Sequence, residues 1–80
     1  MKIKTLFFGI SSDLVKNTQL ELSVKKDSSI KEFKDLLMKK YPQLKNINSY
    51  AIAVNEEYAN DNFILNESDV VAIIPPVSGG

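Results

Sequence analysis

The chain has 80 residues, 44% of them hydrophobic and 25% charged, and ten acidic residues balance ten basic ones. This length gives one domain with one small core. All ten basic residues are lysine, and histidine and cysteine do not occur, which excludes disulfides, thiolate nucleophiles and the usual general base and zinc ligands. A neutral chain without arginine is also poorly suited to nucleic acid. The composition therefore argues against a self-sufficient enzyme.

Residues 2–8 are predicted to form the first strand. Ile3, Thr5 and Phe7 lie on one face of such a strand and the residues between them on the other, which is the period-2 pattern of a pleated surface. The polar segment that follows is expected to be a loop. Residues 19–25 alternate cleanly between apolar and polar side chains, so we expect a second strand that pairs with the first as a hairpin.

A helix is predicted to begin at Ser29, because Ser29 and Glu32 have the spacing of a capping box. The apolar residues of this helix recur at helical spacing: Ile30, Phe33, Leu36, Leu37 and Tyr41. Lys31 and Asp35 have the spacing of an ion pair on the opposite face. Pro42 is expected to end the helix, because its ring disfavours a helical conformation at the preceding residue.

The second half of the chain contains two shorter strands and one long apolar strand. Residues 49–54 are predicted to form a strand that turns through 55–57 into a shorter partner at 58–59. After a polar loop, the apolar residues 63–65 are expected to fill a space beneath it. Residues 70–74 are unbroken apolar and mostly β-branched, which indicates an interior strand with both faces at least partly covered.

This order of elements predicts an α+β fold of the β-grasp, or ubiquitin-like, type. A mixed sheet of four to five strands packs on one main helix, and the last strand lies centrally and parallel to the first after a right-handed crossover. We expect the β-grasp domain to span residues 1–74 and an extended C-terminal tail to span 75–80.

The tail is the most unusual segment of the sequence. It consists of Pro75, Pro76, Val77, Ser78, Gly79 and Gly80. The prolines end the strand and impose an extended exit, and the flexible Gly-Gly end presents a carboxylate on a tip that can enter a narrow channel. The residues alone leave open the alternative of a frayed chain end.

A second candidate site is an apolar patch on the open side of the sheet. Leu6, Phe8 and Ile74 are predicted to face away from the helix, with Tyr58 beside them. The functional interpretation is a docking surface for partner proteins. The alternative is that loops cover these residues, or that they are scattered exposed apolar side chains without a role.

The acidic pairs of the sequence are predicted to have no role in metal binding. Glu56 and Glu57, like Glu67 and Asp69, lie in predicted turns rich in asparagine and serine, where solvated acids are usual. No glycine-containing calcium loop surrounds them. No metal site is therefore expected.

The sequence resembles the molybdopterin synthase small subunits, ubiquitin-like sulfur carriers of the MoaD/ThiS family. The resemblance covers the whole length, and is carried by residues 3–8, by Ala53-Val54-Asn55, and by residues 68–80 with their Pro-Pro-Val-Ser-Gly-Gly end. It implies that an E1-like enzyme uses ATP to adenylate Gly80, which becomes a thiocarboxylate and donates sulfur to cyclic pyranopterin monophosphate.

The resemblance also implies the partners and the role of this chain. The tail enters the large subunit of molybdopterin synthase, which supplies the catalytic residues in a heterotetramer of two small and two large subunits. The small subunit has no catalytic residues and no bound cofactor of its own, and the open sheet face meets both partners. We expect a cytoplasmic protein without membrane or nucleic-acid contact, because no apolar run reaches the roughly 20 residues of a membrane span and no signal-peptide cleavage site follows the N-terminus.

Three other functions stay open at this point. One is a related thiocarboxylate carrier of the thiamine type, although the Pro-Pro before the tail favours the molybdopterin family. Another is a ubiquitin-like modifier joined through Gly80 to lysines of target proteins. The last is an interaction module with an inert tail.

Overall fold

The computed structural model describes residues 1–46 and 50–76. Along this part of the chain the elements are β1 (Lys2–Phe7), α1 (Ile10–Val15), β2 (Gln19–Ser23), α2 (Ile30–Lys40), the 3₁₀ helix η1 (Pro42–Asn46), β3 (Ala51–Val54), β4 (Glu57–Ala59) and β5 (Val70–Ile74). No helix in these two stretches is both long and apolar enough to cross a lipid bilayer.

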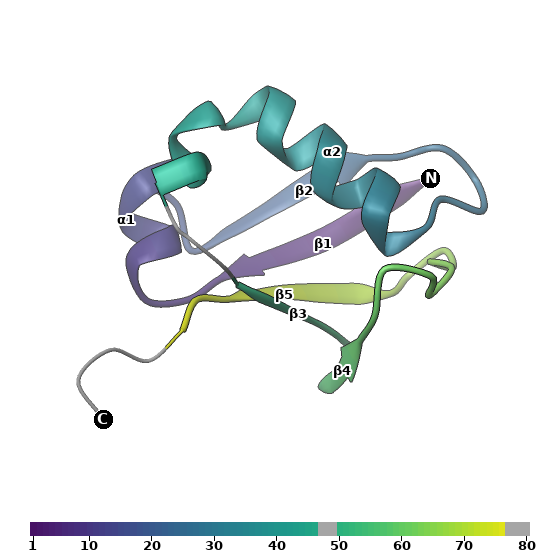
Figure 1. Ribbon diagram of the computed structural model, residues 1–80. Helices are drawn as coiled ribbons and strands as arrows, with labels where there is room; N and C mark the ends of the chain where they lie inside the picture. Colours follow the sequence, from purple (N-terminus) through teal and green to yellow (C-terminus); the bar gives the residue numbers. More distant parts are fainter. Residues whose placement is uncertain (47–49, 77–80) are drawn as a thin grey trace.

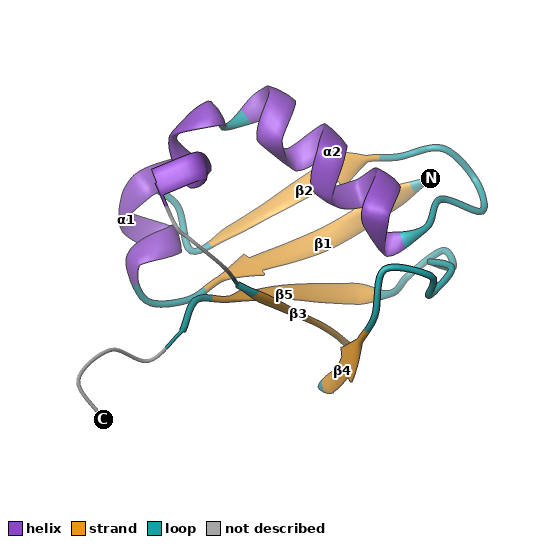
Figure 2. Cartoon of the chain, viewed as in Figure 1, coloured by secondary structure: helices purple, strands orange, loops and turns teal. Residues whose placement is uncertain are grey.

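The five strands form one mixed sheet in the order β2-β1-β5-β3-β4 (Figure 1). The last strand, β5, lies at the centre, parallel to β1 and antiparallel to β3. The helix α2 lies across one face of this sheet, as Figure 2 shows. The predicted β-grasp arrangement, with its central parallel last strand, is therefore confirmed.

The core lies between α2 and the face of the sheet that it covers. In β1, Ile3, Thr5 and Phe7 are buried, whereas Lys4 is exposed and Leu6 is half-buried. The alternation predicted for the first strand is thus confirmed in its register. Further core side chains come from every other strand except β4 and from α2 and η1; among them are Leu22, Phe33, Leu37, Leu44, Ile52, Val71 and Ile73.

The segment between β1 and β2 is a helix, so the prediction of a loop there is wrong. The chain turns at Gly9, which has φ 54° and ψ −137°, and the Ser11 N–H donates a hydrogen bond of 3.1 Å to the Phe8 carbonyl. This is a type II′ turn, which favours glycine at its first central position. The six-residue helix α1 that follows is too short to show a clear periodicity in the sequence. It packs against the core through Val15, which is buried.

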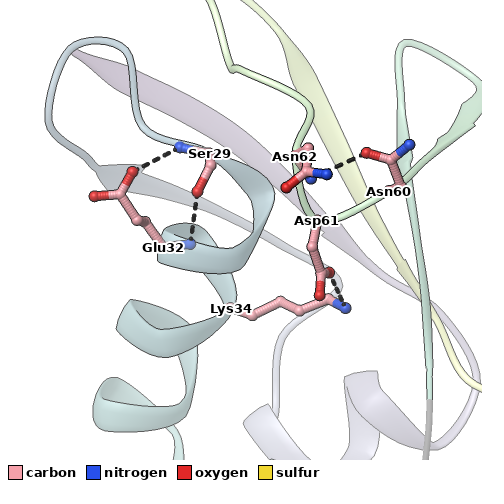
Figure 3. Close-up of polar contacts among 6 residues, drawn as sticks. All are labelled: Ser29, Glu32, Lys34, Asn60, Asp61 and Asn62. Atoms are coloured by element: carbon pink, nitrogen blue, oxygen red, sulfur yellow. Dashed lines mark hydrogen bonds and ion pairs between the residues drawn. The ribbon is translucent and has the colours of Figure 1, made fainter.

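The predicted capping box begins α2. The Ser29 Oγ accepts a hydrogen bond from the Glu32 N–H at 3.2 Å, and the Glu32 carboxylate accepts one from the Ser29 N–H at 3.0 Å (Figure 3). The helix ends at Lys40, directly before Tyr41 and Pro42, as expected. The ends of the most strongly patterned element in the sequence are therefore confirmed.

The loop between β4 and β5, residues 60–69, forms hydrogen bonds and an ion pair with the first turns of α2. The Lys31 N–H donates to the Asp61 carbonyl at 3.1 Å, and the Lys34 Nζ lies 2.8 Å from the Asp61 carboxylate (Figure 3). Lys34 with Asp61 and Lys2 with Glu21 are the ion pairs formed within the described stretches, so the pair predicted from helical spacing, Lys31 with Asp35, is wrong. This loop is joined to the helix by its backbone as well as by charge.

The prediction that residues 63–65 all fill a space beneath the loop is wrong. Only Leu65 is buried, while Phe63 and Ile64 are 40% and 46% exposed. The Phe63 carbonyl accepts a hydrogen bond from the Ile30 N–H, and the Leu65 N–H donates one to the Ser28 carbonyl. Because these backbone bonds draw the segment against the start of α2, its first two side chains stay outside the core.

Candidate functional site

The face of the sheet away from α2 carries an apolar concavity of about 570 Å³. Its apolar lining comes from all the strands except β2 and from the residue that follows β1: Leu6, Phe8, Ala53, Tyr58, Val70, Ala72 and Ile74. The four side chains predicted to form a patch, Leu6, Phe8, Tyr58 and Ile74, therefore line one surface feature. Their role in docking stays a prediction.

Strand register explains the shape of this concavity. Leu6 pairs with Ala72, Ala72 with Ala53, and Ala53 with Tyr58, so the four residues form one row across four strands. Neighbouring strands lie about 4.8 Å apart, which puts the backbones of Leu6 and Tyr58 about 14 Å apart. The two large side chains are the walls and the two alanines are the floor, and Ala53 is only 5% exposed although it does not belong to the core cluster.

Phe8 is an exposed aromatic ring on a fixed backbone. Its side chain is 50% exposed, whereas its N–H donates a hydrogen bond of 3.2 Å to the Ile73 carbonyl. Its own carbonyl accepts hydrogen bonds from both the N–H and the Oγ of Ser11. An exposed side chain with a fixed backbone loses little backbone freedom on binding, which suits an anchor in an interface.

The root of the tail leaves from the edge of the concavity. Ile74 is the last residue of β5 and lines the concavity, and Pro75 follows it directly. Pro75 also lies beside Gly9, where an added Cβ would be 3.8 Å from the Pro75 Cγ. Pro76 is exposed. The remaining predicted site residues, Val77, Ser78, Gly79 and Gly80, lie outside the described residues, and their roles stay predictions.

The other end of the concavity is polar. Asn55 and Glu56 line it and form the turn between β3 and β4, with φ angles of 51° and 72°. The Asn55 side chain donates to the Asp69 carboxylate at 2.9 Å and accepts from the Val70 N–H at 3.0 Å, which ties this turn to the start of β5. Glu56 is exposed, and it is the one charged residue that lines this concavity in the described part of the chain.

A second electrostatic feature lies beside α2. Tyr50 is half-buried, and burial, with smaller contributions from the Asp35 and Asp61 carboxylates, raises the pKa of its phenol above the usual 10.0. The Lys34 Nζ lies 5.7 Å from the centre of the Tyr50 ring, within the range of a cation–π contact. These groups stabilise the junction of α2 with the loop before β5.

The stretches 1–46 and 50–76 contain no group of three or more histidine, cysteine, aspartate or glutamate side chains that could hold a metal ion. The predicted turn after β3 is formed by Asn55 and Glu56 alone, because Glu57 already begins β4, and the predicted turn around Glu67 is present. Asp69 accepts hydrogen bonds from the Asn55 side chain and from the Asn66 N–H. Its carboxylate is therefore a structural group in this turn.

Sequence reasoning missed five residues of the concavity: Ala53, Asn55, Glu56, Val70 and Ala72. Val70 was predicted only as the first residue of the interior strand. The alanines carry little hydrophobic signal and show their role only through strand register. Asn55 in a two-residue turn is a recognisable signal, since asparagine tolerates the left-handed conformation there. Nothing in the sequence indicated that Glu56 borders the apolar patch.

Comparison with known proteins agrees with this architecture. A sequence model of the ThiS family matches residues 5–80. The chain is similar to the molybdopterin synthase sulfur carrier subunit of Arabidopsis thaliana, with 37% identity over 81 residues that cover 100% of this chain and 84% of that protein.

Two solved structures are similar in fold over their whole length and over all of this chain. One is the crystal structure of SAMP1 from Haloferax volcanii, with a TM-score of 0.89 and 20% identity. The other is from the complex of subunits 1 and 2 of molybdopterin-converting factor from Helicobacter pylori, with a TM-score of 0.71 and 28% identity.

Proposed function

Because the chain belongs to the ThiS family, we propose that it is the sulfur carrier subunit of a molybdopterin synthase. The observation that carries this proposal is the apolar concavity that runs to Ile74, the residue from which the tail leaves. A partner that docks on the concavity receives the tail at a fixed starting point. Six residues from Pro75 onward then reach up to about 20 Å when extended.

The reactive atom of this carrier belongs to the backbone carboxylate of Gly80. In an E1-like enzyme, a carboxylate oxygen attacks the α-phosphate of ATP and pyrophosphate leaves. A sulfur nucleophile from a donor system then attacks the acyl carbon and AMP leaves, which produces the thiocarboxylate. Since the chain has neither histidine nor cysteine, its partners supply the acid–base and thiol chemistry of these steps.

The second partner is the large subunit of molybdopterin synthase, in a heterotetramer of two small and two large subunits. There the thiocarboxylate sulfur is transferred to cyclic pyranopterin monophosphate, and two transfers build a dithiolene. The name of the Arabidopsis relative and the two-subunit complex from H. pylori support a large-subunit partner. The cytoplasm stays the predicted compartment.

Reconstitution tests this function. The chain is prepared with a thiocarboxylate at Gly80 and mixed with a molybdopterin synthase large subunit and cyclic pyranopterin monophosphate, and the dithiolene product is quantified. We expect product formation and loss of the sulfur mass from the chain. A variant without Gly80, and one extended beyond it, should give no product with unchanged thermal unfolding, because the described core ends at Ile73.

The alternative functions correspond to other outcomes. Product formation by the chain without Gly80 contradicts a carrier role. Sulfur transfer only to a thiazole precursor identifies a thiamine-type carrier, and conjugates between Gly80 and lysines of other proteins identify a ubiquitin-like modifier. An intact-mass measurement of the chain from its native host separates these outcomes independently.

A further inference from the structure

We propose that the concavity recognises a large-subunit segment that carries a bulky apolar side chain close to a lysine or arginine. The apolar side chain lies on the floor formed by Ala53 and Ala72, and the cation lies against Glu56. The proposal rests on the proposed function and specifies the chemistry that the large subunit presents to this face.

The shape of the floor selects a large side chain. Ala72 and Ala53 are paired in register at the middle of the row, with Leu6 and Tyr58 at its two ends. Because the two alanines have only methyl side chains and their neighbours in the row are larger, they leave a trough two strands wide. A surface that bound a flat apolar partner would not require this trough. A leucine-sized or aromatic side chain fills such a trough and buries the walls at the same time.

The charge at the end of the trough selects a cation. Among the residues that the structure describes, no lysine lines the concavity, although the chain has ten of them. Glu56 takes part in neither of the ion pairs found within the described residues, Lys2–Glu21 and Lys34–Asp61. Its exposed carboxylate at the rim of an apolar surface is therefore available to a cation of a partner.

The backbone at Glu56 does not favour a glutamate side chain. Asn55 and Glu56 are the two central residues of a turn with positive φ angles, 51° and 72°, and glycine is the favoured residue at the second of these positions. A side chain with a Cβ is disfavoured there. Glutamate at this position therefore contributes less folding stability than glycine would. Asp27 has a similar φ of 63°, so what distinguishes Glu56 is its place on the rim of the concavity.

Three variants test the charge. Glu56→Gly removes the carboxylate and the unfavourable conformation together, and Glu56→Gln removes the charge alone. Asp27→Gly is the matched control, because Asp27 is also an exposed acid with a positive φ, 63°, and does not line the concavity. Affinity for the purified large subunit is measured by titration calorimetry at 50 mM and 500 mM salt (about 14 and 4 Å Debye length), and melting temperature by circular dichroism.

We expect both Glu56 variants to bind about two- to fivefold more weakly at low salt, as for an ion pair at an interface rim. The difference should shrink at high salt, where exposed charges are screened. Glu56→Gly and Asp27→Gly should melt at or above the wild-type temperature, and Asp27→Gly should bind as the wild type does. Equal affinity of Glu56→Gln and the wild type at both salt concentrations overturns the ionic contact.

Ala72→Leu tests the shape. It makes the face more apolar while filling the trough, so we expect at least about tenfold weaker binding if a partner side chain occupies that space. Equal or tighter binding by a normally folded Ala72→Leu overturns the trough and indicates a non-specific apolar face. Self-association of the chain that is lost in the Glu56 variants identifies a second copy as the occupant and also overturns the proposal.

Failure of this inference differs from failure of the proposed function. If the wild type neither binds the large subunit nor transfers sulfur, the carrier role is wrong. If the wild type binds and transfers sulfur while the Glu56 and Ala72 variants behave identically to it, the carrier role stands and the recognition chemistry is wrong.

Discussion

Alanine substitution of Phe7 and of Phe8 should separate folding from docking, because the two neighbours have opposite exposures. Phe7 is 3% exposed and its ring packs edge-on against Tyr41 at 6.3 Å. Loss of such a core ring costs about 3–5 kcal/mol, out of about 4–12 kcal/mol for a domain of this length. At about 4–8 °C per kcal/mol, we expect Phe7→Ala to lower the melting temperature by at least about 12 °C.

Phe8→Ala should instead leave stability almost unchanged and weaken binding to the partner. Its ring is 50% exposed and the hydrogen bond from its N–H to the Ile73 carbonyl does not involve the side chain, so the loss of stability should be about 1 kcal/mol or less. Truncation of an aromatic anchor in an interface commonly costs about 2 kcal/mol or more, which is roughly thirtyfold in affinity. We expect that loss in binding to the large subunit.

Urea denaturation and titration calorimetry measure the two effects. Ile10→Ala is the matched control, since Ile10 is 55% exposed, lies two residues away and does not line the concavity; it should change neither quantity strongly. If Phe8 governed stability and Phe7 governed binding, the orientation of β1 on which this reasoning depends would be refuted.

Three further variants test the tail, the turn and one titrating group. Gly79→Val should lower the rate of sulfur transfer at saturating partner, because a branched side chain obstructs a channel that admits only backbone; an unchanged rate means that the channel is wider. Gly9→Ala should destabilise the domain by about 1–3 kcal/mol, since the cost is conformational and the added Cβ meets Pro75 only at 3.8 Å; D-alanine introduced by synthesis should restore stability if this reason holds. The raised pKa of Tyr50 means that the folded state retains the phenol proton longer than the unfolded state, so stability should fall as the pH rises above about 10; Tyr50→Phe should reduce that fall in urea denaturation, and an identical pH dependence contradicts the assignment.

The elements with a repeating pattern could be predicted from the sequence. The period-2 alternation gave the register of β1, and with it the faces of Phe7 and Phe8. The capping box gave the start of α2, because both partners of its two hydrogen bonds stand three residues apart. The apolar run of β5 indicated its central place, since strands with apolar side chains on both faces are typical of the interior of a sheet.

The features that escaped prediction depend on contacts between distant segments. The helix α1 spans six residues, fewer than two turns, so no periodicity could identify it. The exposure of Phe63 follows from its carbonyl, which is engaged by the Ile30 N–H. The floor of the concavity required the register between β3 and β5, which no local pattern gives. The division of the chain at residues 74 and 75 stays a prediction.

The central place of β5 also has a mechanical consequence. The strand pairs with β1 on one side and β3 on the other, through four residue pairs each. A pull on the chain at Ile74 acts along the strand, so it loads the hydrogen bonds to both neighbours together in shear. Because β1 runs parallel to β5, a chain held near Met1 and pulled at Ile74 draws these two strands in opposite directions along their shared ladder. A partner that pulls on the tail therefore has to break the hydrogen bonds of both ladders together, and cannot break them one after another.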